Sequence, residues 1–153
     1  MDRKNLIRGY KKLRVWQDAV ELYVMTCKTL SNLPFELKKV TSNAIDSSHS
    51  ISRNIAEGYC RKSLKDYLKF IYIALGSSGE YHTCIFSMHN AKQISDQDFE
   101  LLDGQHYKTE NGLLQLVKSL QAKLHNGEWN ENLLDINPCL AGRQASSKNP
   151  KIQ

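Results

Sequence analysis

One long stripe of apolar residues at helical spacing constrains the fold of this chain more than any other feature of its sequence. When residues 64–89 are drawn as a helix, the stripe stays within an arc of about 120°. Its members are Leu64, Tyr67, Leu68, Ile71, Ala74, Leu75, Ser78, His82, Ile85, Phe86 and His89. A helix with one apolar face is stable when that face is buried, so the stripe predicts helical neighbours.

Two earlier segments have the same periodicity. The first covers about residues 15–33 and ends there because the residue before Pro34 avoids the helical region. The second covers about residues 35–57 and has a serine-rich stripe, which would let a neighbouring helix come close. Gly58 follows directly and predicts a glycine stop at the end of this second helix.

The ends of the last two helices are marked by capping residues. Ser63 and Asp66 have the spacing of a capping box, so we expect the third helix to begin there and to continue to about Ile94. Residues 95–98 form the acid-rich N-cap region of a fourth helix, which ends at Asn126-Gly127. Short connections and the lack of strand-like alternation predict an all-α, antiparallel up-down four-helix bundle.

Positive charge lies mainly at the two ends of the chain. The formal net charge is +5, yet residues 1–14 carry six Lys and Arg against one acid, and residues 136–153 carry three against none. Residues 15–135 are left close to neutral, which weakens a global electrostatic attraction to nucleic acid. We expect a basic N-terminal arm at 1–12, the bundle at 13–127, and a short docking arm with a disordered basic tail at 128–153.

The sequence predicts a cytoplasmic protein with reduced thiols. No apolar run approaches the roughly 18 residues needed to span a bilayer, and no signal-peptide segment follows the charged start. None of the four cysteines belongs to a CxxC pair; they are Cys27, Cys60, Cys84 and Cys139. We interpret them as free thiols packed as small apolar groups, with a disulfide or a zinc site as the less favoured alternatives.

Three motifs resemble those of a known family. Residues 13–19 (LRVWQDA) resemble L-x-V-W-Q-x-A, and residues 50–58 (SISRNIAEG) resemble S-I-P-S-N-I-A-E-G. Residues 63–80 resemble S-x-K-E-F-x-x-F-x-x-I-A-x-G-S-x-x-E. In this order they resemble the four-helix-bundle family named after reading frames in 23S ribosomal RNA intervening sequences, over about residues 13–124.

The resemblance implies an antiparallel four-helix bundle that assembles as a ring-like homopentamer. It also implies kinship with accessory proteins of diversity-generating retroelements, which bind a reverse transcriptase and its RNA. Most members of the family have no established activity. The chain departs from the family pattern at a basic pair, replaced by Ile45 and Asp46, at a proline, replaced by Ser52, and at an acid, replaced by His82.

A metal centre in the bundle core is the first chemistry to consider. Di-iron bundles use inward Glu and Glu-x-x-His residues, and the chain offers a partial set: Glu21, Asp46, His49, Glu80, Asp103 and His106. Asp46, His49 and Glu80 lie away from the apolar faces of their helices, and His106 faces the core without its partners. We therefore predict no metal and no cofactor.

Two further features have ordinary explanations. His82 and His89 lie on the core stripe, where hydrogen-bonded imidazoles are expected, and a pH-sensitive contact is the alternative. Residues 76–79 (GSSG) lack the strand and lysine of a phosphate loop, so we interpret them as a site of close helix packing. No nucleophile and base can be paired from the sequence, so we predict that the protein is not an enzyme.

Two surface patterns point to binding. Five cations surround the turn between the second and third helices: Arg53, Arg61, Lys62, Lys65 and Lys69. They form either an ordinary solvated face or a phosphate-binding ridge. A second apolar stripe faces away from the core and predicts a subunit interface; its members are Ile45, Ala56, Phe70, Ile73 and Cys84.

The leading functional hypothesis is a non-catalytic oligomeric scaffold that binds RNA, or a protein–RNA partner such as a reverse transcriptase. The five cations and the basic ends would make the contacts. The alternative is a protein–protein interaction module without a nucleic-acid role, which the near-neutral body and the replaced basic pair favour. Neither hypothesis involves a membrane or a small-molecule substrate.

Overall fold

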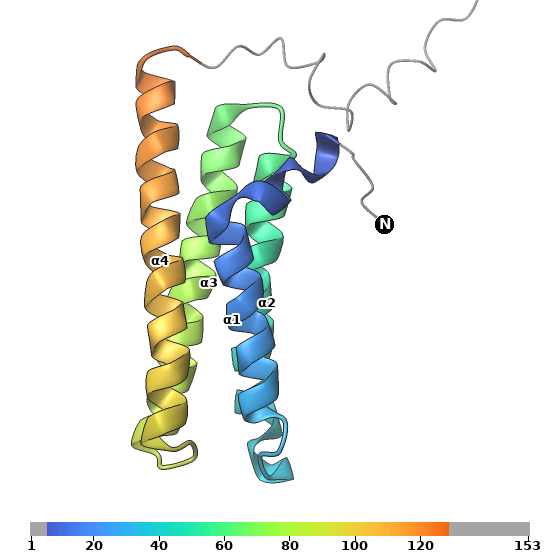
Figure 1. Ribbon diagram of the computed structural model, residues 1–153, viewed down its shortest axis with the longest axis vertical. Helices are drawn as coiled ribbons and strands as arrows, with labels where there is room; N and C mark the ends of the chain where they lie inside the picture. Colours follow the sequence, from blue (N-terminus) through green and yellow to red (C-terminus); the bar gives the residue numbers. More distant parts are fainter. Residues whose placement is uncertain (1–5, 129–153) are drawn as a thin grey trace, which may run out of the picture.

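Four long helices lie side by side in the computed structural model, which describes residues 6–128 (Figure 1). They are α1 (Arg14–Leu30), α2 (Lys38–Tyr59), α3 (Leu64–Asn90) and α4 (Asp96–His125), and two short 3-10 helices, η1 (Leu6–Lys12) and η2 (Phe35–Leu37), precede α1 and α2. Contacts join α1 to α2, α2 to α3, α3 to α4 and α4 back to α1. The predicted four-helix bundle is confirmed, and residues 129–153 of the predicted arm and tail lie outside the described residues.

The core is formed by the predicted stripes, with one shift on α3. Ile51, Ile71 and Leu102 have no exposed surface, and burying such a side chain stabilises the fold by about 1.5–3 kcal/mol. On α3, however, Phe86 is 51% exposed, whereas Tyr81 and Met88 are fully buried. The predicted placement of Phe86 in the core is therefore wrong. The reason is that α3 packs most extensively against α2, which turns the buried arc of α3 toward that helix.

The predicted caps are present. The Ser63 hydroxyl accepts a hydrogen bond from the Asp66 amide at 3.1 Å, and the Ser95 hydroxyl accepts one from the Asp98 amide at 3.0 Å. At the end of α4, Gly127 has a φ of +64°, a left-handed conformation that glycine adopts without strain. These residues fix the lengths of α3 and α4 and so the places where the chain reverses.

Gly58 does not stop α2, contrary to the sequence-based expectation, because the helix continues to Tyr59. Gly58 is buried, and a Cβ atom at this position would lie 2.8 Å from Cδ2 of Tyr67 and 2.9 Å from Cβ of Phe70. Glycine is therefore needed here for the close approach of α2 to α3. Buried serines on the same helix, such as Ser47, donate their hydroxyls to carbonyls of their own helix and leave little bulk at the contact.

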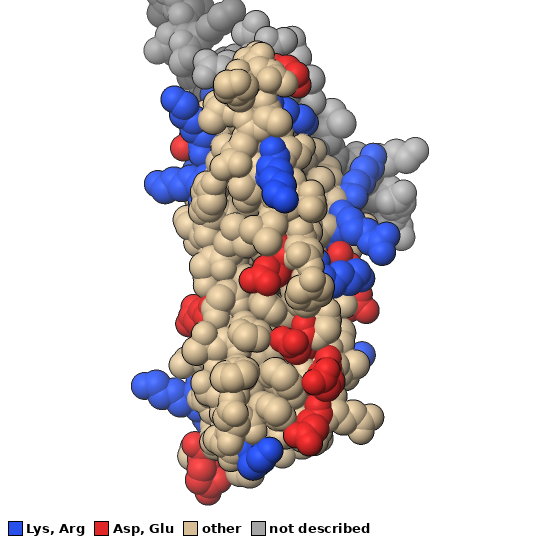
Figure 2. All heavy atoms as spheres, turned by 90° about the vertical axis from the view of Figure 1, so that its left-hand side faces the viewer, with Lys and Arg blue, Asp and Glu red and all other residues tan. Residues whose placement is uncertain are grey.

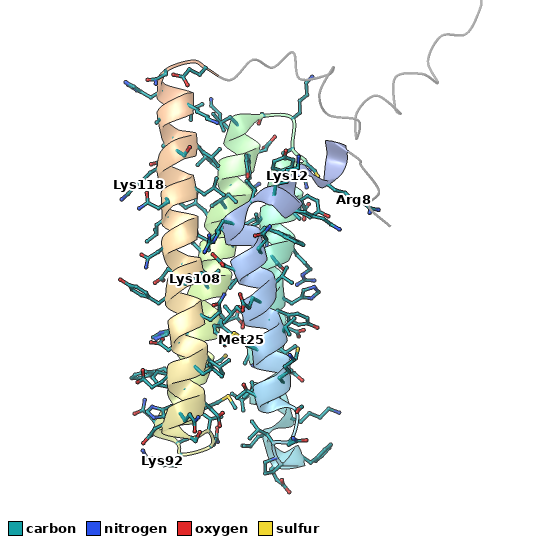
Figure 3. The ribbon with its side chains drawn as sticks, viewed as in Figure 1. Arg8, Lys12, Met25, Lys92, Lys108 and Lys118 are labelled. Carbon is teal, nitrogen blue, oxygen red and sulfur yellow. The ribbon has the colours of Figure 1, made fainter. Side chains whose placement is uncertain are left out.

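The contact between α1 and α4 depends on a buried acid. The Asp18 carboxylate is almost fully buried and lies 2.7 Å from the Lys108 ammonium, while the Gln105 side chain donates to the Asp18 carbonyl at 2.9 Å. One turn away, Gly112 lets α4 approach Val15 of α1. Figure 3 shows Lys108 between the two helices.

Within residues 6–128, no helix is long and apolar enough to cross a membrane.

Replacing Gly58 with alanine should destabilise the bundle by about 1–3 kcal/mol, because the added methyl group overlaps Tyr67 and Phe70. Chemical denaturation would measure the change. The matched control is Gly104→Ala in α4, where a Cβ atom meets nothing within 4 Å. There the higher helix propensity of alanine should raise stability by up to about 1 kcal/mol. Equal effects of the two substitutions would contradict this explanation of Gly58.

Candidate nucleic-acid interface

The five predicted cations lie at one end of the bundle, around the turn that joins α2 to α3 (Figure 1). All five are exposed: Arg53 on α2, Arg61 and Lys62 in the turn, and Lys65 and Lys69 on the first turns of α3. The capped start of α3 at Ser63 places Lys65 and Lys69 one helical turn apart on the same face. Four of the five cations thus lie in the turn or on the first turns of α3, Arg53 lies on the last two turns of α2, and the phosphate-binding ridge stays a prediction.

Arg61 is held by two contacts within the subunit. Its guanidinium forms an ion pair with Glu57 and lies 4.4 Å from the centre of the Phe70 ring. Glu57 offsets part of the charge of Arg61, and the aromatic contact fixes the orientation of the guanidinium. Lys65 and Lys69, in contrast, form no ion pair within residues 6–128. These two lysines therefore contribute uncompensated charge.

The structure adds the N-terminal segment to this end, which the sequence did not predict. The rings of Tyr10 and Trp16 are 5.2 Å apart, and Tyr10 lies 6.2 Å from Tyr59 at the end of α2. Gly9 permits the contact, because a Cβ atom there would lie 2.1 Å from the Tyr59 hydroxyl. This aromatic cluster fastens η1 onto α1 and α2. As a result the exposed cations of η1 and the start of α1 lie at the same end of the bundle as the predicted ridge: Arg8, Lys11, Lys12 and Arg14.

Charge is strongly segregated along the bundle. We define the basic end as residues 6–14, 53–69 and 114–128, which meet at the upper end of Figure 1. These segments carry eleven Lys and Arg and three acids, whereas the other described residues carry five Lys and ten acids. Figure 2, which faces the α4 side, shows Lys and Arg mainly above and Asp and Glu mainly below. The labelled side chains of Figure 3 place Lys118 toward the basic end and Lys92 at the opposite end.

The predicted interface stripe is only partly exposed. Ile73 is 42% exposed, and the remaining four keep part of their surface: Ile45, Ala56, Phe70 and Cys84. Phe70 packs against Gly58 and Arg61 within the subunit. Larger exposed apolar side chains lie on α3 and α4, which the sequence analysis did not single out: Tyr72, Phe86, Leu101, Tyr107 and Leu114. The subunit interface stays a prediction.

A line of histidines lies between α3 and α4. The Nε2 atom of His106 lies 2.8 Å from the Ser78 hydroxyl oxygen and 3.1 Å from the Ser78 carbonyl oxygen. His82 stacks on His106 and lies 3.3 Å from Asp103, and His89 lies 2.8 Å from Asp96. Each histidine thus has a hydrogen-bonding or charged partner, as expected for His82 and His89.

Ser78 and His106 form a serine–histidine pair that the sequence analysis did not find, because 28 residues separate them. Ser78 has no exposed surface, so a substrate has no access to its hydroxyl. The pair instead joins α3 to α4 inside the core.

Within residues 6–128, no group of three or more His, Cys, Asp or Glu side chains could hold a metal ion. No disulfide joins the three described cysteines.

The packing explanation of residues 76–79 is correct for the serines and wrong for the glycines. Ser77 lies 2.9 Å from the Ser50 hydroxyl of α2, and Ser78 faces His106. Gly76 and Gly79 face open space, since a Cβ atom at either position meets nothing within 4 Å. The two glycines therefore leave the outer face of α3 bare rather than bringing a helix closer.

Comparison with known proteins gives two findings. Residues 11–115 match the family described as 23S rRNA-intervening sequence protein. A crystal structure of a protein of unknown function from the S23 ribosomal protein family, from Bacteroides thetaiotaomicron, resembles this fold with a TM-score of 0.54. It shares 17% sequence identity and covers 74% of this chain and 99% of its own. No curated protein matches the chain.

Acid should weaken the bundle through His106. Burial lowers the pKa of this imidazole, so the native state keeps it neutral while the unfolded chain takes up a proton below about pH 6.5. The unfolded state then binds more protons, and the free energy of unfolding falls as pH drops through this range. Urea denaturation between about pH 5 and 7.5 measures this effect. As the pH drops, the free energy of unfolding should fall less for His106→Gln than for wild type.

The matched control is His125→Gln, which changes an exposed histidine at the end of α4. This variant should keep the pH profile of the wild type. Identical profiles for wild type and His106→Gln would contradict a neutral, buried His106.

Proposed function

Because the chain belongs to the 23S rRNA-intervening sequence protein family, we propose that it is a non-catalytic oligomeric scaffold that binds RNA through its basic end. The RNA would be bound alone or together with a protein such as a reverse transcriptase. The single observation that carries the proposal is the segregation of eleven Lys and Arg, against three acids, at one end of the bundle.

Because its positive charge is gathered at one end, the chain should bind RNA more strongly than its modest net charge suggests. Phosphates respond to the charge within about 10 Å at 0.1 M salt, so the local excess matters more than the total. Each phosphate that a Lys or Arg neutralises releases counterions, which makes affinity fall steeply with salt. Packing of η1 through Tyr10 and Tyr59 holds its cations against the end of α2, at the same end of the bundle as the α2–α3 turn, instead of leaving them on a separate arm.

Assembly would multiply this effect. If subunits are arranged around a ring, as the family resemblance implies for a homopentamer, their basic ends lie on one face of the ring. Several weak contacts to one RNA would then act together. Ile73 and the half-buried members of the predicted stripe remain the proposed subunit contact.

The second candidate function is a protein-interaction module without a nucleic-acid role. The exposed apolar side chains of α3 and α4 favour it, since Phe86 is 51%, Leu101 53% and Tyr107 65% exposed. Apolar surface gathered on neighbouring helices is typical of protein-binding sites. Phe86, Leu101 and Tyr107 lie outside the basic end, so mutations can separate the two functions.

Charge reversal tests the leading proposal. A triple variant, Arg53→Glu with Lys65→Glu and Lys69→Glu, should bind structured RNA far more weakly than wild type. The slope of log K against log salt should fall by about two to three units, because three phosphate contacts are lost. Fluorescence anisotropy across about 50–200 mM salt measures both quantities. The control reverses Lys28, Lys39 and Lys92, which lie outside the basic end, and should leave the slope nearly unchanged.

Truncation separates the folded end from the sequence termini. Removing residues 1–5 and 139–153 keeps η1 and its aromatic contacts, so binding through the basic end should persist. Loss of all RNA binding in this truncated chain would assign the RNA contacts to the removed termini and contradict the basic end. Wild-type affinity for RNA that is absent, or that does not vary with salt, would favour the protein-interaction module.

A further inference from the structure

A shallow groove, open to solvent, runs along the first turns of α3 and begins within the basic end. It is lined by Lys65, Leu68, Lys69, Tyr72 and Ile73, of which Ile73 also belongs to the proposed subunit contact. Its floor is apolar and two ammonium groups stand at its side, which is the composition of a site for a ligand with a flat apolar part and a negative charge.

Tyr72 is held in place although half of its surface is exposed. Its hydroxyl accepts a hydrogen bond from the Gln121 side chain of α4 at 2.8 Å, and its exposed fraction is 50%. A ring fixed at its tip loses little conformational freedom when a ligand stacks on it. One turn further along α3, Gly76 adds no side chain beside the ring, since a Cβ atom there meets only open space.

Lys65 and Lys69 stand seven and three residues before Tyr72, on the same face of α3. Neither is neutralised by an acid within residues 6–128. Lys65 and Tyr72 are separated by about 10 Å along the helix axis, a span that a short stretch of nucleotide backbone covers. Phosphates can therefore contact the lysines while a base lies on the ring.

We propose that this groove binds an unpaired nucleotide, with its base stacked on Tyr72 and its flanking phosphates on Lys65 and Lys69. The inference rests on the proposed RNA binding and specifies which form of RNA is preferred. Bases in a duplex are stacked on one another and do not offer a free face, whereas unpaired bases stack on aromatic side chains. The basic end then prefers single-stranded segments, loops or bulges over continuous duplex.

Substitution at Tyr72 tests the stacking. Tyr72→Ala should weaken binding of a single-stranded RNA by about 5- to 150-fold, since stacking of one base contributes about 1–3 kcal/mol. Binding of a blunt duplex with the same number of phosphates should not change, and neither should the salt slope. Tyr72→Phe keeps the ring and should retain most of the affinity. The matched control is Phe35→Ala, which removes a 79% exposed ring far from the basic end and should have no effect.

A second measurement does not depend on a variant. Single-stranded RNA carrying 4-thiouridine, crosslinked by light to the wild-type protein, should attach to the peptide that contains Tyr72. Light scattering measures the oligomer mass of wild type and Tyr72→Ala, which should be the same for both.

The outcomes separate this inference from the proposed function. If the wild type binds no RNA at low salt, both fail. A second outcome is that the wild type binds RNA with a steep salt dependence while Tyr72→Ala lowers the affinity for single-stranded and duplex RNA equally, or lowers neither affinity. In that case only the stacking site is wrong. A changed oligomer mass for Tyr72→Ala, or a crosslink confined to other peptides, would also overturn it and assign the groove to contact with a second copy.

Discussion

The close approach of α2 to α3 at Gly58 is the constraint on which the rest of this structure depends. With no side chain at this position, Tyr67 and Phe70 pack directly against the backbone of α2. The turn that follows is consequently short, and Arg61 and Lys62 lie beside the first turns of α3. The same contact orients Tyr59, whose ring faces Tyr67 on one side and Tyr10 on the other. One glycine thus positions both the ridge and the segment that extends it.

Helical periodicity predicted the fold because each helix has a single buried face. The stripe positions Ile71, Ala74 and Ile85 are buried as expected. The exact rotation of a helix could not be predicted in the same way, since it depends on how tightly each neighbour packs. Phe86, which the stripe placed in the core, is therefore exposed, and Tyr81, which is not part of the stripe, is buried. Capping was predicted at Ser63 and Ser95, where the signal is local, and failed at Gly58, where the reason for glycine lies on another helix.

The candidate site was predicted only where its residues are close together in the sequence. The cations near the α2–α3 turn are close in sequence, so their clustering could be seen without a structure. Those of η1 and of the end of α4 are far away in sequence, and summing charge along the chain made the body look nearly neutral. Only the fold shows that the acids and the cations occupy opposite ends. Pairs across helices, such as Ser78 with His106 or Tyr72 with Gln121, have no signal in a single sequence.

An elongated body with cations at one end and acids at the other behaves as a large electric dipole. In the field of a polyanion such a body experiences a torque that turns its positive pole forward before any contact is made. The productive orientation is then selected during diffusion, and the fraction of collisions that lead to binding rises. Added salt removes this guidance at distances beyond about 10 Å, so encounter rates should respond to ionic strength even where the final contacts do not.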